Sequence, residues 1–337
     1  MATEANMNET YDVTVIREDL QEQYTMLSPE ELPFQAAIGS KSVENTYFEW
    51  TTVDLADPDM TNRVNEGEQA PATDAPTNAV RLGNYTQISD KKVVTSHTDN
   101  AVDAAAEDIN RQAEQIAIKM REMKRDVEMM LLQNIPAAAG AGGGSAARQM
   151  AGLPAFLRTN TTRESGGADP TLSGSTAGYP DAGATAGTTP VPLTEDAFND
   201  AITSCWTAGS TPTMALVDAL NKRVISKTFT GSSTRYKDAV DKRLVAAIDI
   251  YTSDFGELDI VPTRFLPSTQ EAGNGANKPV YILDPDYIRM VWLDEVQQKP
   301  LAETGHAFER LIWGEYSLQV DAEDAHAVIA DTNGLAA

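Results

Sequence analysis

The segment from Asn100 to Asn134 constrains the fold more than any other part of this sequence. Its apolar residues recur at alternating steps of four and three, and residues at these spacings share one face of an α-helix. The segment contains no Gly or Pro and is rich in helix-favouring Ala, Glu, Lys, Arg and Met. It therefore predicts one long amphipathic helix. The apolar stripe consists of Val102, Ala106, Ile109, Ala113, Ile116, Met120, Met123, Val127 and Met130.

Such a helix would be about 50 Å long, and Asp99 or Asn100 is its expected N-cap. Two interpretations of it stay open. A stripe of this kind permits a coiled coil. The alternative is a spine that packs against a sheet of its own chain. Ala and Met at several stripe positions and the β-rich flanking sequence favour the spine.

Composition and charge exclude several classes of protein. The 337 residues include 50 acidic and 26 basic side chains, which gives a net charge of −24. A free-standing nucleic-acid binder is excluded, because its affinity would come from cationic contacts to phosphate. The single cysteine, Cys205, rules out an intramolecular disulfide framework and is expected to be a small buried side chain on a helix. No signal peptide or membrane-spanning run is apparent, so we expect a protein that folds in a cytoplasm.

The N-terminal part of the chain predicts an arm and a protruding hairpin. Met1 to Tyr24 are polar and acidic, which predicts an arm that a partner orders. Ser28, with Pro29 and Glu31, matches the signature of a helix start. Two strand candidates, Asn45–Val53 and Tyr85–Thr98, flank a long polar stretch with no core of its own. We therefore expect this hairpin to find its burial on a neighbouring subunit.

The remainder of the chain predicts an insertion, an α/β block and a final set of strands. Pro136–Pro192 is rich in Gly, Ala, Ser and Thr and predicts flexible surface insertions, interrupted by an apolar anchor at Gly152–Leu157. Thr194 is expected to cap a helix, followed by alternating strands and helices to about Val261. From Pro279 the sequence predicts an antiparallel β meander with a turn at Gly314, on which the long helix would lie.

A search of the sequence finds no catalytic or metal-binding motif that would indicate an enzyme. The three histidines, His97, His306 and His326, form no metal-ligand pair. The acidic series that begins at Asp54 lacks the Gly and the closing Glu of a calcium loop. No phosphate loop, dinucleotide fingerprint or nucleophile elbow is present. We therefore expect no enzymatic activity, no cofactor and no metal.

The sequence resembles the major capsid proteins of tailed bacteriophages, which have the Hong Kong 97 phage fold. It is most similar to the family whose type member is the head protein of phage SU-ten. The resemblance extends over most of the chain, is weakest from Arg158 to Pro192, and rests on the order and spacing of its motifs. The matching stretches are LSPEELPFQAAIG (Leu27–Gly39), NTYFEW (Asn45–Trp50), RLGNYTQISDKKVVTSHT (Arg81–Thr98), the long helix, and GLPAFL (Gly152–Leu157).

This resemblance implies an α+β fold with six parts. They are an N-terminal arm (1–43), an extended β-hairpin loop (44–98), a spine helix of the peripheral domain (99–135), a Gly/Ala-rich insertion with a short anchor (136–193), an α/β axial domain (194–278), and peripheral-domain strands with the C-terminus (279–337). The implied function is self-assembly into hexamers and pentamers of an icosahedral virion capsid. The capsid encloses double-stranded DNA and is assembled in the cytoplasm of the bacterial host.

The implied partners are other copies of the chain, a separate scaffolding protein, a portal and a decoration protein, without a membrane. Some members of this fold cross-link their shells through a lysine of the extended loop, but this chain has no lysine between Val43 and Asp90. We therefore predict a shell without that covalent bond. The residues proposed for contacts between subunits are Trp50, Arg63, Glu66, Glu68 and Arg81.

Three alternatives come from other classes. A nanocompartment shell of the same fold, of the encapsulin type, would enclose enzymes and not DNA. A coiled-coil scaffold protein would use the helical stripe alone, and the fragment from Asp99 to Asn134 would then be dimeric by itself. An acidic hydrolase would need a site that the motif search does not find.

Overall fold

The computed structural model describes residues 28, 30–53, 55–56, 58–63, 65–67, 69, 77–101, 111–141, 146–229, 237–238, 243–244, 249–266, 278–302 and 305–334. The chain divides into two compact units. The smaller one includes Lys91–Met120 and Gln298–Ile312. The larger one consists of Glu30–Asp90, Arg121–Gln297 and Trp313–Ala337.

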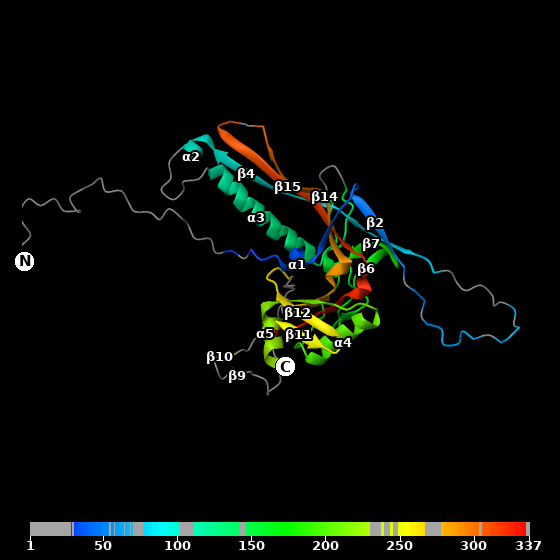
Figure 1. Cartoon of the computed structure of the whole chain (residues 1–337). Coiled ribbons are helices and arrows are strands. Elements are labelled where there is room, and N and C mark those ends of the chain that lie inside the picture. Colours follow the sequence, from blue (N-terminus) through cyan, green and yellow to red (C-terminus); the bar gives the residue numbers. More distant parts are fainter. Residues whose placement is uncertain are drawn as a thin grey trace, which may run out of the picture. The chain divides into compact units, whose positions relative to one another are not determined.

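The helices are short except for one (Figure 1). They are α1 (Pro33–Ala37), α2 (His97–Ala101), α3 (Arg111–Leu132), α4 (Glu195–Thr207) and α5 (Ala219–Thr228), with single 3-10 turns at Leu153–Ala155, Pro285–Tyr287 and Glu323–Ala325. Among the described residues, none of the helices combines the length and apolarity needed to cross a bilayer.

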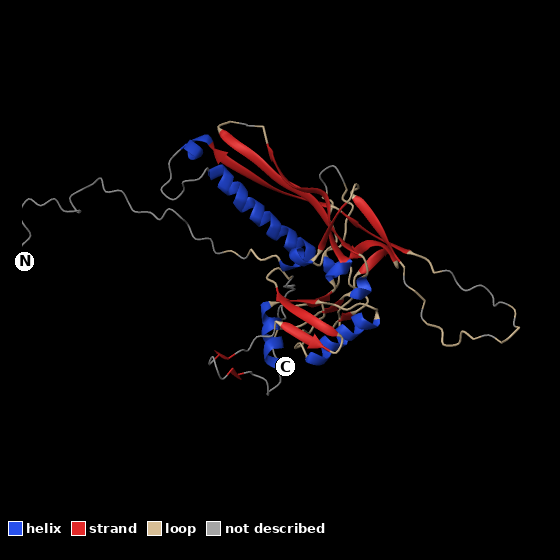
Figure 2. Ribbon diagram, in the orientation of Figure 1, coloured by secondary structure: helices blue, strands red, loops and turns tan. Residues whose placement is uncertain are grey.

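Among the described residues, the strands form three larger sheets and one small ribbon (Figure 2). The first has the order β1 (Gly39–Ser42), β14 (Ile288–Pro300), β15 (Ala307–Val320), β4 (Gln87–Ser96). The second has the order β2 (Tyr47–Thr52), β3 (Val80–Tyr85), β7 (Ala177–Ala182), β6 (Thr171–Gly174). The third is mixed, in the order β11 (Ile250–Ser253), β12 (Gly256–Pro262), β8 (Met214–Val217), β13 (Val280–Leu283), β16 (Ala327–Ile329), β5 (Thr161–Thr162). The ribbon pairs β9 (Lys237–Asp238) with β10 (Arg243–Leu244).

The long helix is confirmed from Arg111 to Leu132, while residues 102–110 lie outside the described residues. Of the predicted stripe, Met123 and Val127 are buried, but Met130 is half-buried and Ala113 is exposed. Burial continues instead at Leu131, which the stripe did not include. The N-cap prediction was wrong: α2 begins at His97, and the Ser96 hydroxyl accepts from the Thr98 and Asp99 amides.

The short N-terminal helix also begins later than predicted. It starts at Pro33 and not after Ser28, and Leu32 at its N-cap position forms no side-chain cap. Proline fits the first helical position because its φ is preset and it has no N–H to satisfy. The next two amide groups are capped from α3: the Glu128 carboxylate accepts from Phe34 N (2.9 Å) and from Gln35 N (3.0 Å).

The predicted turn at Gly314 is wrong, because β15 runs through it without a break from Ala307 to Val320. A Cβ at Gly314 would lie 3.2 Å from Val296 Cγ2 and 3.4 Å from Met123 Cε. The glycine therefore permits α3 to pack closely on the strand. The predicted place of the helix, on the terminal strands, is confirmed at this point.

The terminal strands do not form one meander. The strands β13 and β16 join β8 in the third sheet, whereas β14 and β15 belong to the first. A 3-10 turn begins at Pro285, capped by Asp284, whose carboxylate accepts from Asp286 N. This turn separates β13 from β14 and sends the chain from one sheet to another.

The stretch predicted to be a flexible insertion, 136–192 apart from its anchor, forms regular strand pairs where the structure describes it. Within it, β6 and β7 form a hairpin, and Leu82 of β3 pairs with Gly178 of β7. Asp331 fixes another part of the insertion, because its carboxylate accepts hydrogen bonds from Glu164 N and Gly187 N. The anchor prediction is confirmed, since Leu153, Phe156 and Leu157 are buried.

The α/β block agrees well with the sequence. Thr194 caps α4 by accepting from Ala197 N, and Asp218 caps α5 by accepting from Leu220 N. Both helices pack on the third sheet in a core that includes Cys205. Burial raises the pKa of the Cys205 thiol to about 12, and the nearby Asp284 carboxylate adds to this rise.

Candidate assembly interface

The hairpin formed by β2 and β3 shows two faces with different roles. Its strands pair from Tyr47↔Tyr85 to Thr52↔Val80, so alternate side chains point to opposite faces. On one face Phe48 and Trp50 are buried. The Trp50 ring lies 5.7 Å from Phe48 and 5.9 Å from Phe156 of the same chain.

Three tyrosines gather around the base of the same hairpin. The Tyr47 and Tyr85 rings lie 4.7 Å apart, and Tyr179 of β7 is 5.2 Å from Tyr85. A Cβ at Gly83 would lie 2.5 Å from the Tyr47 hydroxyl, so glycine lets the Tyr47 ring cover β3. Burial raises the pKa of Tyr47 to about 12, helped by the Glu49 carboxylate, which accepts a hydrogen bond from its hydroxyl. The hairpin is thus tied to the ordered insertion.

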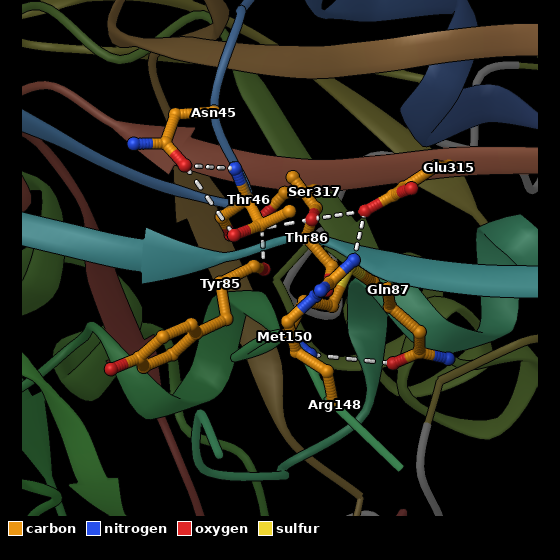
Figure 3. Close-up of polar contacts among 9 residues, drawn as sticks. All are labelled: Asn45, Thr46, Tyr85, Thr86, Gln87, Arg148, Met150, Glu315 and Ser317. Carbon is orange, nitrogen blue, oxygen red and sulfur yellow. Dashed lines mark hydrogen bonds and ion pairs between the residues drawn. The ribbon is translucent and has the colours of Figure 1, made fainter. Parts of the chain in front are cut away.

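A polar cluster fixes the end of β3 to β15 (Figure 3). Arg148 donates from Nε to the Thr86 carbonyl at 2.7 Å and forms an ion pair with Glu315. The Thr86 hydroxyl donates to the same Glu315 carboxylate at 2.5 Å. Ser317 donates from its hydroxyl to the Tyr85 carbonyl at 2.8 Å.

Next to this cluster the buried Asn84 uses both ends of its amide. It donates to the Leu318 carbonyl at 2.8 Å and accepts from Ala151 N at 2.9 Å. Buried polar groups that are fully paired specify one geometry and are costly to disrupt. The strands therefore leave the body of the larger unit at a fixed point.

Beyond the strands, the described part of the loop from 53 to 79 extends away from the ends of β2 and β3 (Figure 2). It carries two large apolar side chains that are almost fully exposed, Leu55 at 92% and Met60 at 96%. Asp59 accepts from the Thr61 amide and hydroxyl, and these bonds lower the pKa of Asp59. Where the structure describes it, the loop therefore has local turns but no core of its own.

The structure places the residues predicted for subunit contacts as follows. Arg63 and Glu66 are exposed on the loop, and Glu68 lies outside the described residues. Arg81 is exposed and forms an ion pair with Glu49 at 3.3 Å. Trp50 packs within its own chain at 8% exposure, and its indole nitrogen has no hydrogen-bond partner among the described residues. These placements leave the predicted contacts themselves untested.

Sequence reasoning missed Leu55 and Met60, although two large apolar residues in a polar, Pro-rich loop were a readable signal. It also missed Arg148 and Glu315, for which no local signal exists because 167 positions separate them. No group of three or more His, Cys, Asp or Glu within the described residues could hold a metal ion. Of the series that begins at Asp54, both Asp54 and Asp57 lie outside the described residues.

One family model matches nearly the whole chain. A family model described as SU10 major capsid protein matches residues 4–333. The "Major capsid protein" of Escherichia phage Phieco32 is 34% identical over 111 residues, which cover 32% of this chain and 30% of that protein. The chain thus aligns with about a third of this curated relative.

Solved structures show the fold. A chain of Microbacterium phage Oxtober96 matches with a TM-score of 0.58 at 12% identity, covering 95% of this chain and 98% of that chain. A chain of Gordonia phage Cozz matches with a TM-score of 0.60 at 11% identity, covering 97% and 96%. This confirms the predicted α+β Hong Kong 97 phage capsid fold.

Proposed function

Because the chain belongs to the SU10 major capsid protein family, we propose that it forms the shell of a phage head by self-assembly into hexamers and pentamers. The shell encloses double-stranded DNA without sequence-specific contacts. Its assembly takes place in the bacterial cytoplasm, and its role is structural and not catalytic. The net charge of −24 supports a container that does not adhere to its genome.

The loop between β2 and β3 carries the proposal. Leu55 and Met60 are almost fully exposed at the end of a hairpin whose base is held by Thr86, Arg148 and Glu315. An apolar surface of this kind on a fixed support is a protein-binding surface. We propose that it packs on an adjacent copy, with Arg63, Glu66, Glu68 and Arg81 forming polar contacts around it.

The division into parts follows the family. Residues 1–43 form the N-terminal arm, 44–98 the extended loop, 99–135 the spine helix, 136–193 the insertion, 194–278 the axial domain and 279–337 the peripheral strands. The ordering of 158–192 by β7 adds a structural role for the insertion as a support of the extended loop. The proposed partners are a separate scaffolding protein, a portal and a decoration protein.

Electron microscopy and sedimentation of the full-length protein, alone and co-expressed with neighbouring genes, test this function. We expect capsomer rings or closed polyhedral shells. A monomer or dimer that stays unchanged with concentration and with the co-expressed genes would overturn the proposal. Particles that contain an enzyme and no DNA would instead indicate the encapsulin type of shell.

A paired substitution tests the loop. Leu55→Ser with Met60→Ser should lower the fraction of protein in particles by about tenfold or more, because buried apolar anchors dominate such interfaces. The melting temperature of the unassembled protein should stay unchanged, since these side chains touch little in their own chain. Val94→Thr, at another exposed apolar position, is the matched control and should assemble normally. Normal assembly of the paired variant would exclude the loop contact.

A further inference from the structure

The helices α4 and α5 carry opposite charges. The sequence of α4 contains three acidic residues and no basic residue, whereas that of α5 contains three basic residues and no acidic one. Asp196 and Asp200 are exposed on α4, and Arg223 and Lys227 are exposed on α5. The charge of each helix is therefore of one sign where it meets solvent.

Both exposed pairs have the spacing i, i+4. Residues at this spacing lie about 6 Å apart on one helix face, and like charges there destabilise the helix. None of these four side chains forms an ion pair with another described residue. The half-buried neighbour Lys222 behaves differently, since it bonds to Asp249 (3.1 Å) and to the Ile260 carbonyl (2.7 Å). Within the described part of the chain, Lys222 therefore has a partner of opposite charge, whereas the two exposed pairs have none.

The two helices lie over different parts of the third sheet. The helix α4 packs on β16 and β5 at one edge, and α5 packs on β12 near the other. Their inner sides meet around Phe198 of α4, whose ring lies 5.4 Å from Tyr251 of β11 and 5.5 Å from Phe229 at the end of α5. In Figure 1 they flank β11 and β12 from opposite sides. On α4, Trp206 adds an apolar group that is 52% exposed and lies 5.0 Å from the Phe255 ring. The exposed charged pairs of both helices point away from this shared core and stay open to a second copy.

We propose that α4 of one copy binds α5 of the next copy around a capsomer, with Asp196 and Asp200 facing Arg223 and Lys227. The two pairs have opposite charge and the same spacing, so they match in register when the helices lie side by side. The contact joins two different surfaces, and such heterologous contacts close into rings. This inference rests on the proposed shell function and names the electrostatic contact that would hold each ring.

Three variants of the full-length protein test the contact. The first has Asp196→Lys and Asp200→Lys, so that both helices are basic. The second has Arg223→Glu and Lys227→Glu, so that both are acidic. The third combines all four changes, which exchanges the signs and keeps the net charge of −24. The third variant is the matched control, because it contains every substitution and restores the attraction.

We expect each two-residue variant alone to place about tenfold less protein in particles than the wild type, because like charges meet at every contact. The exchanged variant should recover assembly. Wild-type assembly should also weaken with rising salt, because these exposed charges are screened. Recovery in the exchanged variant also shows that the substitutions do not prevent folding.

Mixing the two-residue variants gives a sharper result. The acidic α4 of one then meets the basic α5 of the other, so that the two variants must alternate around a ring. Alternation closes rings with an even number of subunits and fails for an odd number. We expect hexamers, sheets or tubes in electron micrographs of the mixture, without the pentamers that closed icosahedral shells need.

Normal shells from either two-residue variant alone would overturn the inference, and so would failure of the exchanged variant to assemble while its melting temperature equals that of the wild type. Pentamers in the mixture would exclude the alternating contact. In each case assembly of the wild-type protein would leave the shell function standing. Absence of particles from the wild type itself would instead count against the proposed function.

Discussion

His326 is buried beside the start of the 3-10 turn at Pro285. Its Nδ1 accepts from Asp284 N at 3.2 Å, and its Nε2 has no hydrogen-bond partner among the described residues. Burial lowers the pKa of His326 to about 3 from its ordinary value of 6.5. The folded protein therefore holds this imidazole neutral at pH values where the unfolded chain protonates it.

The lowered pKa predicts a loss of stability in acid. Below pH 6.5 the unfolded state binds a proton that the folded state does not, so the free energy of unfolding falls as the pH falls toward 3. The slope contributed by this residue is about 1.4 kcal/mol per pH unit. Urea unfolding of the unassembled protein from pH 7 to 4 measures it.

The variant His326→Asn isolates this contribution. Asparagine keeps an acceptor for Asp284 N but does not titrate, so the unfolding midpoint of the variant should depend less steeply on pH than that of the wild type. Identical slopes for the two proteins would contradict the assignment of the acid sensitivity to His326.

The roles of some residues could be predicted from the sequence, and those of others could not. The burial of Cys205 on a helix was predicted correctly, because a lone cysteine among periodic apolar positions has few other uses. The role of Glu128 was not foreseen, since its partner amides at Phe34 and Gln35 are more than ninety positions away. Such pairings depend on tertiary structure and leave no local pattern.

At the scale of elements, α4, β8 and α5 were predicted closely, because caps at Thr194 and Asp218 and a fully apolar strand are local signals. The strand expected at 85–98 forms at Gln87–Ser96, but it joins the first sheet. The hairpin partner of β2 is instead a separate strand before it, Val80–Tyr85. Strand pairing is a long-range property. For the same reason Gly314 was mistaken for a turn.

The attachment of α1 to α3 through Glu128 gives a prediction about local order. Burial acts to raise the pKa of Glu128, and the bonds from Gln35 and Phe34 only partly oppose it, so the pKa is raised overall. Glu128→Ala would leave both amides without an acceptor, at a cost of about 2–4 kcal/mol. We expect amide hydrogen exchange of Phe34 and Gln35 to accelerate by about thirtyfold or more.

Two further variants serve as comparisons for this exchange measurement. Glu128→Gln keeps one acceptor and should give an intermediate rate. Met129→Ala, at an exposed position on the same helix, should leave the exchange of α1 unchanged. Unaltered exchange in Glu128→Ala would show that α1 is held by other contacts.

At the scale of the whole molecule, the absence of lysine between Val43 and Asp90 predicts that mature particles contain no isopeptide bond from the extended loop. On denaturing gels the protein should run as one band at the monomer position. The gel samples are prepared by heating the particles in denaturant without reducing agent. A ladder of bands above the monomer would contradict the prediction.

The single cysteine of the chain lies inside the core between α4 and the third sheet, and its thiol stays protonated because burial raises its pKa to about 12. The thiolate is the form of cysteine that exchanges with disulfides and reacts with oxidants. A particle built from this chain can therefore pass from reducing to oxidising surroundings without gaining or losing a sulfur bond.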